Sequence, residues 1–171
     1  MRLIAADFTV RVSDADETLP AGLAPPEAVM TLAKRKGDSV FSAGGADDTV
    51  VAADTVVCAA GEILGKPGTE AEARAMLRTL SGRAHTVYTG VYVRSAERAV
   101  SFCAATEVEF YPLTDAEIDA YIATGEPFDK AGGYGIQSRG ALLVRAIRGD
   151  FYNVVGFPVA EVSRALQQFG W

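Results

Sequence analysis

The sequence predicts one α/β domain, residues 1–171, in which helices flank a twisted, mixed β-sheet. With 171 residues, 49% of them hydrophobic, the chain can bury one good core and suits one domain better than two. Residues 49–60 are a nearly continuous run of β-branched and small side chains, which is typical of a strand covered on both faces. The predicted elements mix strands and helices without strict alternation, which favours a mixed sheet.

The elements of the first third follow from local patterns. Residues 7–13 alternate apolar and polar side chains and predict a strand. Two prolines and apolar residues at helical spacing predict a helix from about Pro26 to Lys36, and a turn-rich connection then leads to the strand at 49–60. Residues 61–67 are expected to return beside that strand as a short hairpin arm.

The rest of the chain carries clear helix signals between strands. The clearest helix covers 69–82, where Thr69 supplies a cap, acids fill the first turn and a glycine follows the last. Similar patterns predict strands at 85–95, 99–112 and 141–149, a second well-capped helix at 113–125, a connection at 150–158 and a last amphipathic helix from 159 to 170.

Composition excludes several classes of protein. Sixteen Lys and Arg against 22 Asp and Glu give a net charge of −6, and no basic cluster is long enough to follow a nucleic-acid backbone. We therefore expect no polymeric nucleic-acid partner. There is no apolar run of about 18 residues and no signal-peptide pattern, so we expect no membrane partner and a cytoplasmic location. Cys58 and Cys103 lack metal-ligand spacing, and we interpret them as reduced core residues.

Asp54 stands near the middle of the apolar run and is the first candidate for chemistry. An ionised carboxylate that is buried without a partner is costly, so a strand seldom carries one without a purpose. Two interpretations stay open. Asp54 could cap a turn at a strand end, or it could be a metal-binding or general-base carboxylate with the Thr55 hydroxyl beside it. Glu17 would be the second acid of such a site.

Three lysines could complete a site for an anion. Lys66 precedes Pro67, which holds its backbone extended, and a hairpin would let it face the same cavity as Asp54. Lys36 ends its predicted helix. Each of these charges, taken alone, also fits an ordinary exposed surface.

The segment EPFDKAGGYGIQ, residues 126–137, sets three glycines around a tyrosine. Glycines permit backbone conformations that are closed to other residues, and they let a ligand approach closely. Lys130 supplies a cation suited to a phosphate, and Gln137 supplies a paired donor and acceptor suited to a base edge. A purely structural loop under a helix C-terminus is the alternative.

Two common kinds of active site are not supported. His85 is the single histidine and the cysteine spacing is unsuitable, so we expect no zinc site. No G-x-S-x-G segment occurs, so a Ser-His-Asp triad lacks its nucleophile. The remaining carboxylates and lysines suit metal-assisted attack on a phosphate, in which Mg²⁺ or Mn²⁺ bridges acid and phosphate.

Five segments, AADTVV, ILGKP, LSGRAHTVYTGV, EPFDKAGGYGIQ and NVVGFP, together resemble the Maf family of nucleoside triphosphate pyrophosphatases from about residue 5 onward. The resemblance implies a Maf/inosine-triphosphate-pyrophosphatase-like fold with a cleft. It also implies hydrolysis of a nucleoside triphosphate to the monophosphate and pyrophosphate, with a divalent cation (Mg²⁺, Mn²⁺ or Co²⁺). The loop is similar to the branch that acts on dTTP and UTP. Family members are often dimers, so a homodimer is expected as a partner.

The same resemblance implies roles for individual residues. Asp54 would be the proton acceptor that activates water and, with Glu17, a metal ligand. Thr55 and Gln137 would set base specificity. The remaining polar lining around the triphosphate and metal would come from Glu17, Lys36 and Lys66.

One departure from the family pattern lies at the N-terminus. Family members begin with a strand and an S-x-S-P-R-R motif whose Ser and Arg side chains meet the phosphates at a helix N-terminus. This sequence opens with MRLIAADFTV and lacks that motif. We expect either a start site placed too late or a shortened protein, less active than a full-length relative. The alternative function is a catalytically impaired nucleotide-binding or septum-regulating protein.

Overall fold

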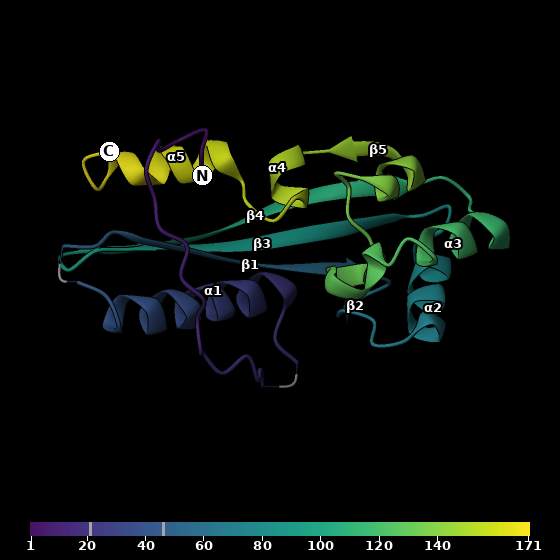
Figure 1. Cartoon of the computed structure of the whole chain (residues 1–171), viewed down its shortest axis with the longest axis horizontal. Coiled ribbons are helices and arrows are strands. Elements are labelled where there is room, and N and C mark those ends of the chain that lie inside the picture. The colour runs from purple at the N-terminus through teal and green to yellow at the C-terminus, as the bar shows by residue number, and fades with distance from the viewer. Residues whose placement is uncertain (21, 46) are drawn as a thin grey trace. The chain divides into compact units, whose positions relative to one another are not determined.

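The computed structural model describes residues 1–20, 22–45 and 47–171. Figure 1 labels its principal elements. The helices are α1 (Pro25–Ser42), α2 (Glu70–Leu80), α3 (Asp115–Ile122), α4 (Phe151–Val154) and α5 (Val159–Gln167), with short 3₁₀ helices η1 (Glu126–Asp129), η2 (Ala131–Gly133) and η3 (Arg139–Leu143). The strands are β1 (Val50–Ala59), β2 (Glu62–Leu64), β3 (Ala84–Arg94), β4 (Ala99–Phe110) and β5 (Val144–Arg148).

The strands form one sheet in the order β2-β1-β3-β4-β5. In the recorded registers, β1 pairs antiparallel with β2, with Val57 opposite Leu64, and β4 pairs antiparallel with β5, with Val108 opposite Ile147. The predicted α/β class with flanking helices is confirmed, and the sheet is antiparallel where we expected a mixed one. Short turns join β1 to β2 and β3 to β4, whereas a parallel pair needs a long crossover.

The chain forms two compact units, which are described separately. The first comprises Met1–Asp54, Thr89–Ala104 and Gly156–Trp171, and the second comprises Thr55–Tyr88 and Ala105–Val155. That the whole chain acts as one domain stays a prediction. None of the described helices is long and apolar enough to cross a membrane.

Helix α1 and the C-terminal helix α5 are the helices of the first unit. Glu27, in the first turn of α1, accepts a hydrogen bond from the Ala24 backbone N–H at 3.4 Å, and prolines occupy the start as expected. The predicted end of this helix at Lys36 is wrong, because α1 continues to Ser42. The glycine after Lys36 does not end the helix. The helical turn that contains it carries an ion pair four residues apart, in which the Lys34 Nζ lies 2.5 Å from the Asp38 Oδ2.

The apolar core of the first unit lies between β3 and α5. It contains Val91, Val93, Val162, Ala165 and Leu166, all buried. The amphipathic pattern that predicted the last helix therefore describes its buried face correctly.

The strand predicted at residues 7–13 does not form, and the structure assigns no regular secondary structure to this segment. Val10 and Val12 are 82% and 91% exposed. The alternating pattern therefore buries no apolar face, and burial of one face is what stabilises such a strand.

The second unit packs α2 and α3 against each other (Figure 1). Both helices start as predicted. The Thr69 hydroxyl accepts a hydrogen bond from the Glu72 N–H at 3.2 Å, and Thr114 forms a reciprocal capping box with Glu117. The expected connection after β5 contains the short helix α4, which Asp150 caps by accepting from the Tyr152 N–H at 2.8 Å.

Gly90 lets α1 lie directly on β3 within the first unit. A Cβ added at Gly90 would lie 2.6 Å from the backbone nitrogen of Met30 in α1, and closer still to the carbonyl of Val29. We expect Gly90→Ala to lower the free energy of unfolding by about 1–3 kcal/mol, because the helix must move away from the sheet. Urea denaturation measures the change.

Gly65→Ala is the matched control for this experiment, since a Cβ there meets no atom within 4 Å. An unfolding midpoint for Gly90→Ala equal to that of the parent would show that α1 does not rest on β3 at this point.

Candidate active site

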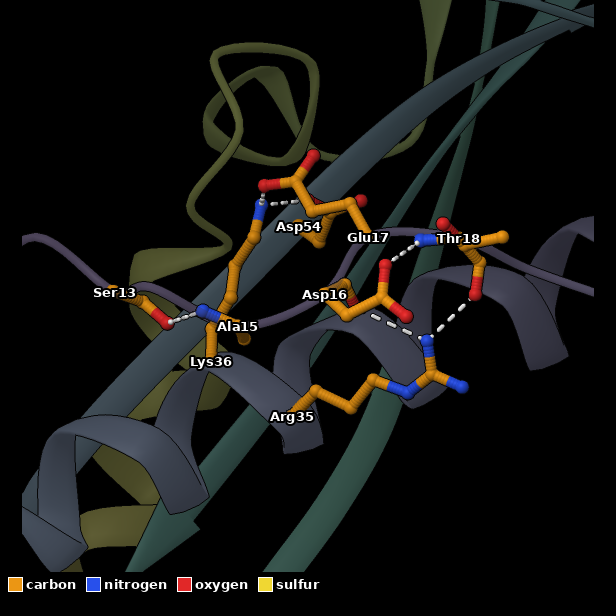
Figure 2. Close-up of polar contacts among 8 residues, drawn as sticks. All are labelled: Ser13, Ala15, Asp16, Glu17, Thr18, Arg35, Lys36 and Asp54. Atoms are coloured by element: carbon orange, nitrogen blue, oxygen red, sulfur yellow. Dashed lines mark hydrogen bonds and ion pairs between the residues drawn. The ribbon is translucent and has the colours of Figure 1, made fainter.

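Asp54 lies inside β1 and has a cationic partner. Its side chain is only 12% exposed, and its Oδ1 lies 2.5 Å from the Lys36 ammonium nitrogen (Figure 2). Since Asp54 is not at a strand end, the turn-capping interpretation does not hold. The charge in the apolar run is balanced by a lysine that α1 carries across the face of the strand.

Glu17 reaches the same ammonium from the N-terminal segment. Its Oε1 lies 2.9 Å from the Lys36 nitrogen, although Glu17 itself is 64% exposed. Figure 2 shows the lysine pointing between the two carboxylates. Burial lowers the pKa of Lys36, but the hydrogen bonds to Asp54 and Glu17 outweigh burial and raise that pKa above its ordinary value. The ammonium therefore stays charged at neutral pH.

Arg35 holds the segment that carries Glu17, and the sequence analysis missed this residue. Its guanidinium donates to the backbone carbonyl of Asp16 at 3.0 Å and to that of Thr18 at 2.7 Å (Figure 2). These carbonyls flank Glu17. The only available signal was a second basic residue next to Lys36, because backbone acceptors leave no mark in a sequence.

A cavity of about 550 Å³ lies in the first unit. Lys36 lines it, together with residues 7–11 and 47–53 and the C-terminal Trp171. The site has the volume for a small ligand, since pockets of this kind measure about 300–1,000 Å³. Of the predicted site residues, Lys36 is the one in its lining.

Asp54 and Glu17 belong to the first unit with Lys36, whereas the remaining predicted residues belong to the second unit. Thr55 follows Asp54 in β1 and is half-buried, whereas Lys66 is exposed directly after β2. Lys130 donates to both carboxylate oxygens of Asp129 at 2.6 Å. This hydrogen bond is the main reason that the pKa of Asp129 lies below its ordinary value, and the nearby charge of Lys66 adds to the effect.

The loop that carries Lys130 and Gln137 is fixed to the arm that carries Lys66. The Gly132 N–H donates to the Gly65 carbonyl at 2.9 Å. Gly132 has φ +69°, and a Cβ there would lie 2.8 Å from the Cβ of Val57, so glycine is required. Gln137 is exposed at the end of the loop. That Lys66 faces the same cavity as Asp54 stays a prediction.

Asp54 and Glu17 are also the expected metal ligands. Their oxygens converge on one cation, the ammonium group of Lys36. Mg²⁺ is commonly bound by one or two carboxylates together with substrate phosphates. The donor set therefore fits a divalent cation of this kind. Among the residues that the structure describes, no group of three or more His, Cys, Asp or Glu side chains could hold a metal ion.

The fold and these motifs define a member of the Maf family. A family described as "Maf-like protein" matches residues 1–169. The chain belongs to this family, and the resemblance read from its motifs is confirmed.

Individual relatives carry a more specific name. The chain is 47% identical over 169 residues to a Bacillus cereus protein named dTTP/UTP pyrophosphatase. The aligned region covers 99% of this chain and 88% of the relative. It is 48% identical to a Bacillus velezensis protein of the same name, over 99% of this chain and 89% of the relative. A Bacillus mycoides protein with that name is 47% identical, over 99% of this chain and 88% of the relative.

Proposed function

We propose that this chain is a nucleoside triphosphate pyrophosphatase that hydrolyses dTTP and UTP to the monophosphate and pyrophosphate. Relatives that are 47–48% identical carry the name of this activity. The observation that carries the proposal is the convergence of Asp54 and Glu17, from distant segments, on the single ammonium of Lys36. Such a cluster of two carboxylates and one lysine suits a reaction at a phosphate.

In the proposed reaction, Asp54 is the general base. It accepts a proton from a water molecule whose oxygen forms a bond to the α-phosphorus. The bond between the α-phosphorus and the bridging oxygen breaks, and pyrophosphate leaves with the electron pair. Lys36 orients the Asp54 carboxylate through the 2.5 Å ion pair and supplies positive charge beside it.

Asp54 and Glu17 would hold a divalent cation in this proposal. When bound, Mg²⁺, Mn²⁺ or Co²⁺ would neutralise charge on the phosphate oxygens. Lys66 and Lys130 would contribute further positive charge toward the triphosphate, and Thr55 and Gln137 would select the base. The homodimer and the cytoplasmic location stay predictions.

Product analysis tests the proposal directly. The chain is incubated with dTTP, UTP, 7-methyl-GTP and ATP in the presence of Mn²⁺, and the products are separated by chromatography. We expect dTMP and UMP with equimolar pyrophosphate, and slower turnover of the two purine nucleotides. Release of orthophosphate instead would contradict the proposed bond cleavage. A folded protein that binds dTTP without turnover would favour the impaired nucleotide-binding alternative.

A further inference from the structure

His85 is a buried titratable residue that the proposed reaction does not use. It is 4% exposed and lies in the second unit, with its ring edge-to-face against Phe110 and Tyr134 at centroid distances of 5.1 and 5.4 Å. Its Nε2 lies 2.8 Å from the Tyr134 hydroxyl, while its Nδ1 has no hydrogen-bond partner in the described part of the chain. A buried polar atom without a partner is costly, so an apolar residue would fill this space at lower cost.

Tyr134 is the residue that this histidine holds. It lies in the glycine loop, is 5% exposed, and packs its ring on Phe110 at 4.7 Å. Beside it, the Gly135 N–H donates to the Tyr121 hydroxyl at 3.1 Å. On the other side, the Gly132 N–H donates a hydrogen bond to the Gly65 carbonyl. The loop is therefore fixed at three points within four residues.

The two residues proposed to meet the nucleotide lie just outside this anchored stretch. Lys130 precedes the first anchor by two residues, and Gln137 follows the last anchor by two. A hydrogen bond also joins the two segments that flank the loop, because the Glu126 Oε1 accepts from the Arg139 N–H at 3.3 Å. Because the loop is held on both sides of Tyr134, the position of the Tyr134 ring against His85 and Phe110 determines where the backbone near Lys130 and Gln137 lies.

We propose that His85 and Tyr134 act as a pair of positioning residues, which hold the loop so that Lys130 and Gln137 present a fixed geometry to the nucleotide. This inference rests on the proposed function. The hydrogen bond selects one depth for the tyrosine ring in an otherwise apolar pocket, where ring packing alone would permit several. A shift of about 1 Å in a substrate-positioning group is enough to lower activity by up to 10²-fold.

Tyr134→Phe removes the hydroxyl and keeps the ring. We expect the ratio of kcat/KM for UTP to kcat/KM for CTP to fall by about 3–10-fold, because the two bases differ at the edge that Gln137 would read. This ratio does not depend on how much of the sample is folded, so a merely structural defect leaves it unchanged. Tyr152→Phe is the matched control, since that tyrosine is 43% exposed.

Two further measurements separate the possible failures. His85→Leu should reduce the same ratio, and the double variant should fall no further than either single variant, because both changes break the one hydrogen bond between Nε2 and the Tyr134 hydroxyl. Hydrogen exchange at the Gly135 amide should accelerate at least 10-fold in Tyr134→Phe, which tests the positioning without any turnover.

An unchanged ratio together with unchanged exchange at Gly135 would overturn the positioning pair. Gln137→Ala tests the specificity part independently. If this variant keeps the parent's ratio while exchange at Gly135 rises in Tyr134→Phe, the assigned role of Gln137 fails and the anchoring of the loop by His85 stands. If the parent itself releases no pyrophosphate, the proposed function fails, and only the exchange measurement decides on the anchoring.

Discussion

Asp54→Asn is expected to lower the turnover of dTTP by about 10²–10⁴-fold while the protein stays folded. An amide has the shape of the carboxylate but cannot accept the proton of the attacking water. The fold should tolerate the change because Lys36 keeps its second partner, Glu17, at 2.9 Å. Initial rates of pyrophosphate release measure the effect, and circular dichroism with thermal melting verifies the fold.

Asp119→Asn is the matched control for this variant. It also removes a carboxylate from an ion pair, here with Arg74, but Asp119 is 54% exposed and lies on α3. Its turnover should equal that of the parent. If Asp54→Asn keeps more than about half of the parent's kcat, Asp54 is not the general base, since even a modest general base contributes about 10².

The elements with strong local signals could be predicted from the sequence. The helices α2 and α3 begin at Thr69 and Thr114, whose hydroxyls cap the first turn, and such caps depend only on residues three apart. The end of α1 could not be placed in this way. The glycine there suits a helix end in isolation, and it is the packing of the helix that lets it continue to Ser42.

Pairing between strands is the information that local patterns lack. The alternation at residues 7–13 is genuine, yet Val12 is 91% exposed and no strand forms. A strand exists only where another segment completes its hydrogen bonds, and the partner is distant in sequence. The antiparallel sheet was missed for a related reason, because the sequence does not state which strands are neighbours.

The candidate site was predictable in its residue types and less so in its geometry. Asp54 could be singled out because a charge in an apolar run needs a partner, and that partner is Lys36. The role of Arg35 could not be predicted, since it binds backbone carbonyls. His85 was considered only as a zinc ligand, although its contact with Tyr134 is the informative one.

His85 should also make the stability of the protein depend on pH. Burial alone lowers the pKa of His85 from 6.5 to about 4. Between these values the unfolded chain binds a proton that the folded protein does not, so stability rises with pH across this window. The neutral ring thus contributes in full above pH 6.5, and its contribution is lost as the pH falls toward 4. At about 1.36 kcal/mol per pH unit, the total loss is about 3 kcal/mol.

The upper part of this window isolates the histidine, because the chain has no other histidine. Carboxylates whose pKa is lowered by hydrogen bonds, such as Asp38 and Glu117, lose their stabilising effect only at more acidic pH. Urea denaturation of the parent should therefore show a loss of about 2 kcal/mol between pH 7.5 and 5. His85→Gln should abolish this slope, whatever its absolute stability. An equal slope in both proteins would mean that the folded and unfolded states bind this proton equally, so that burial does not lower the pKa of His85.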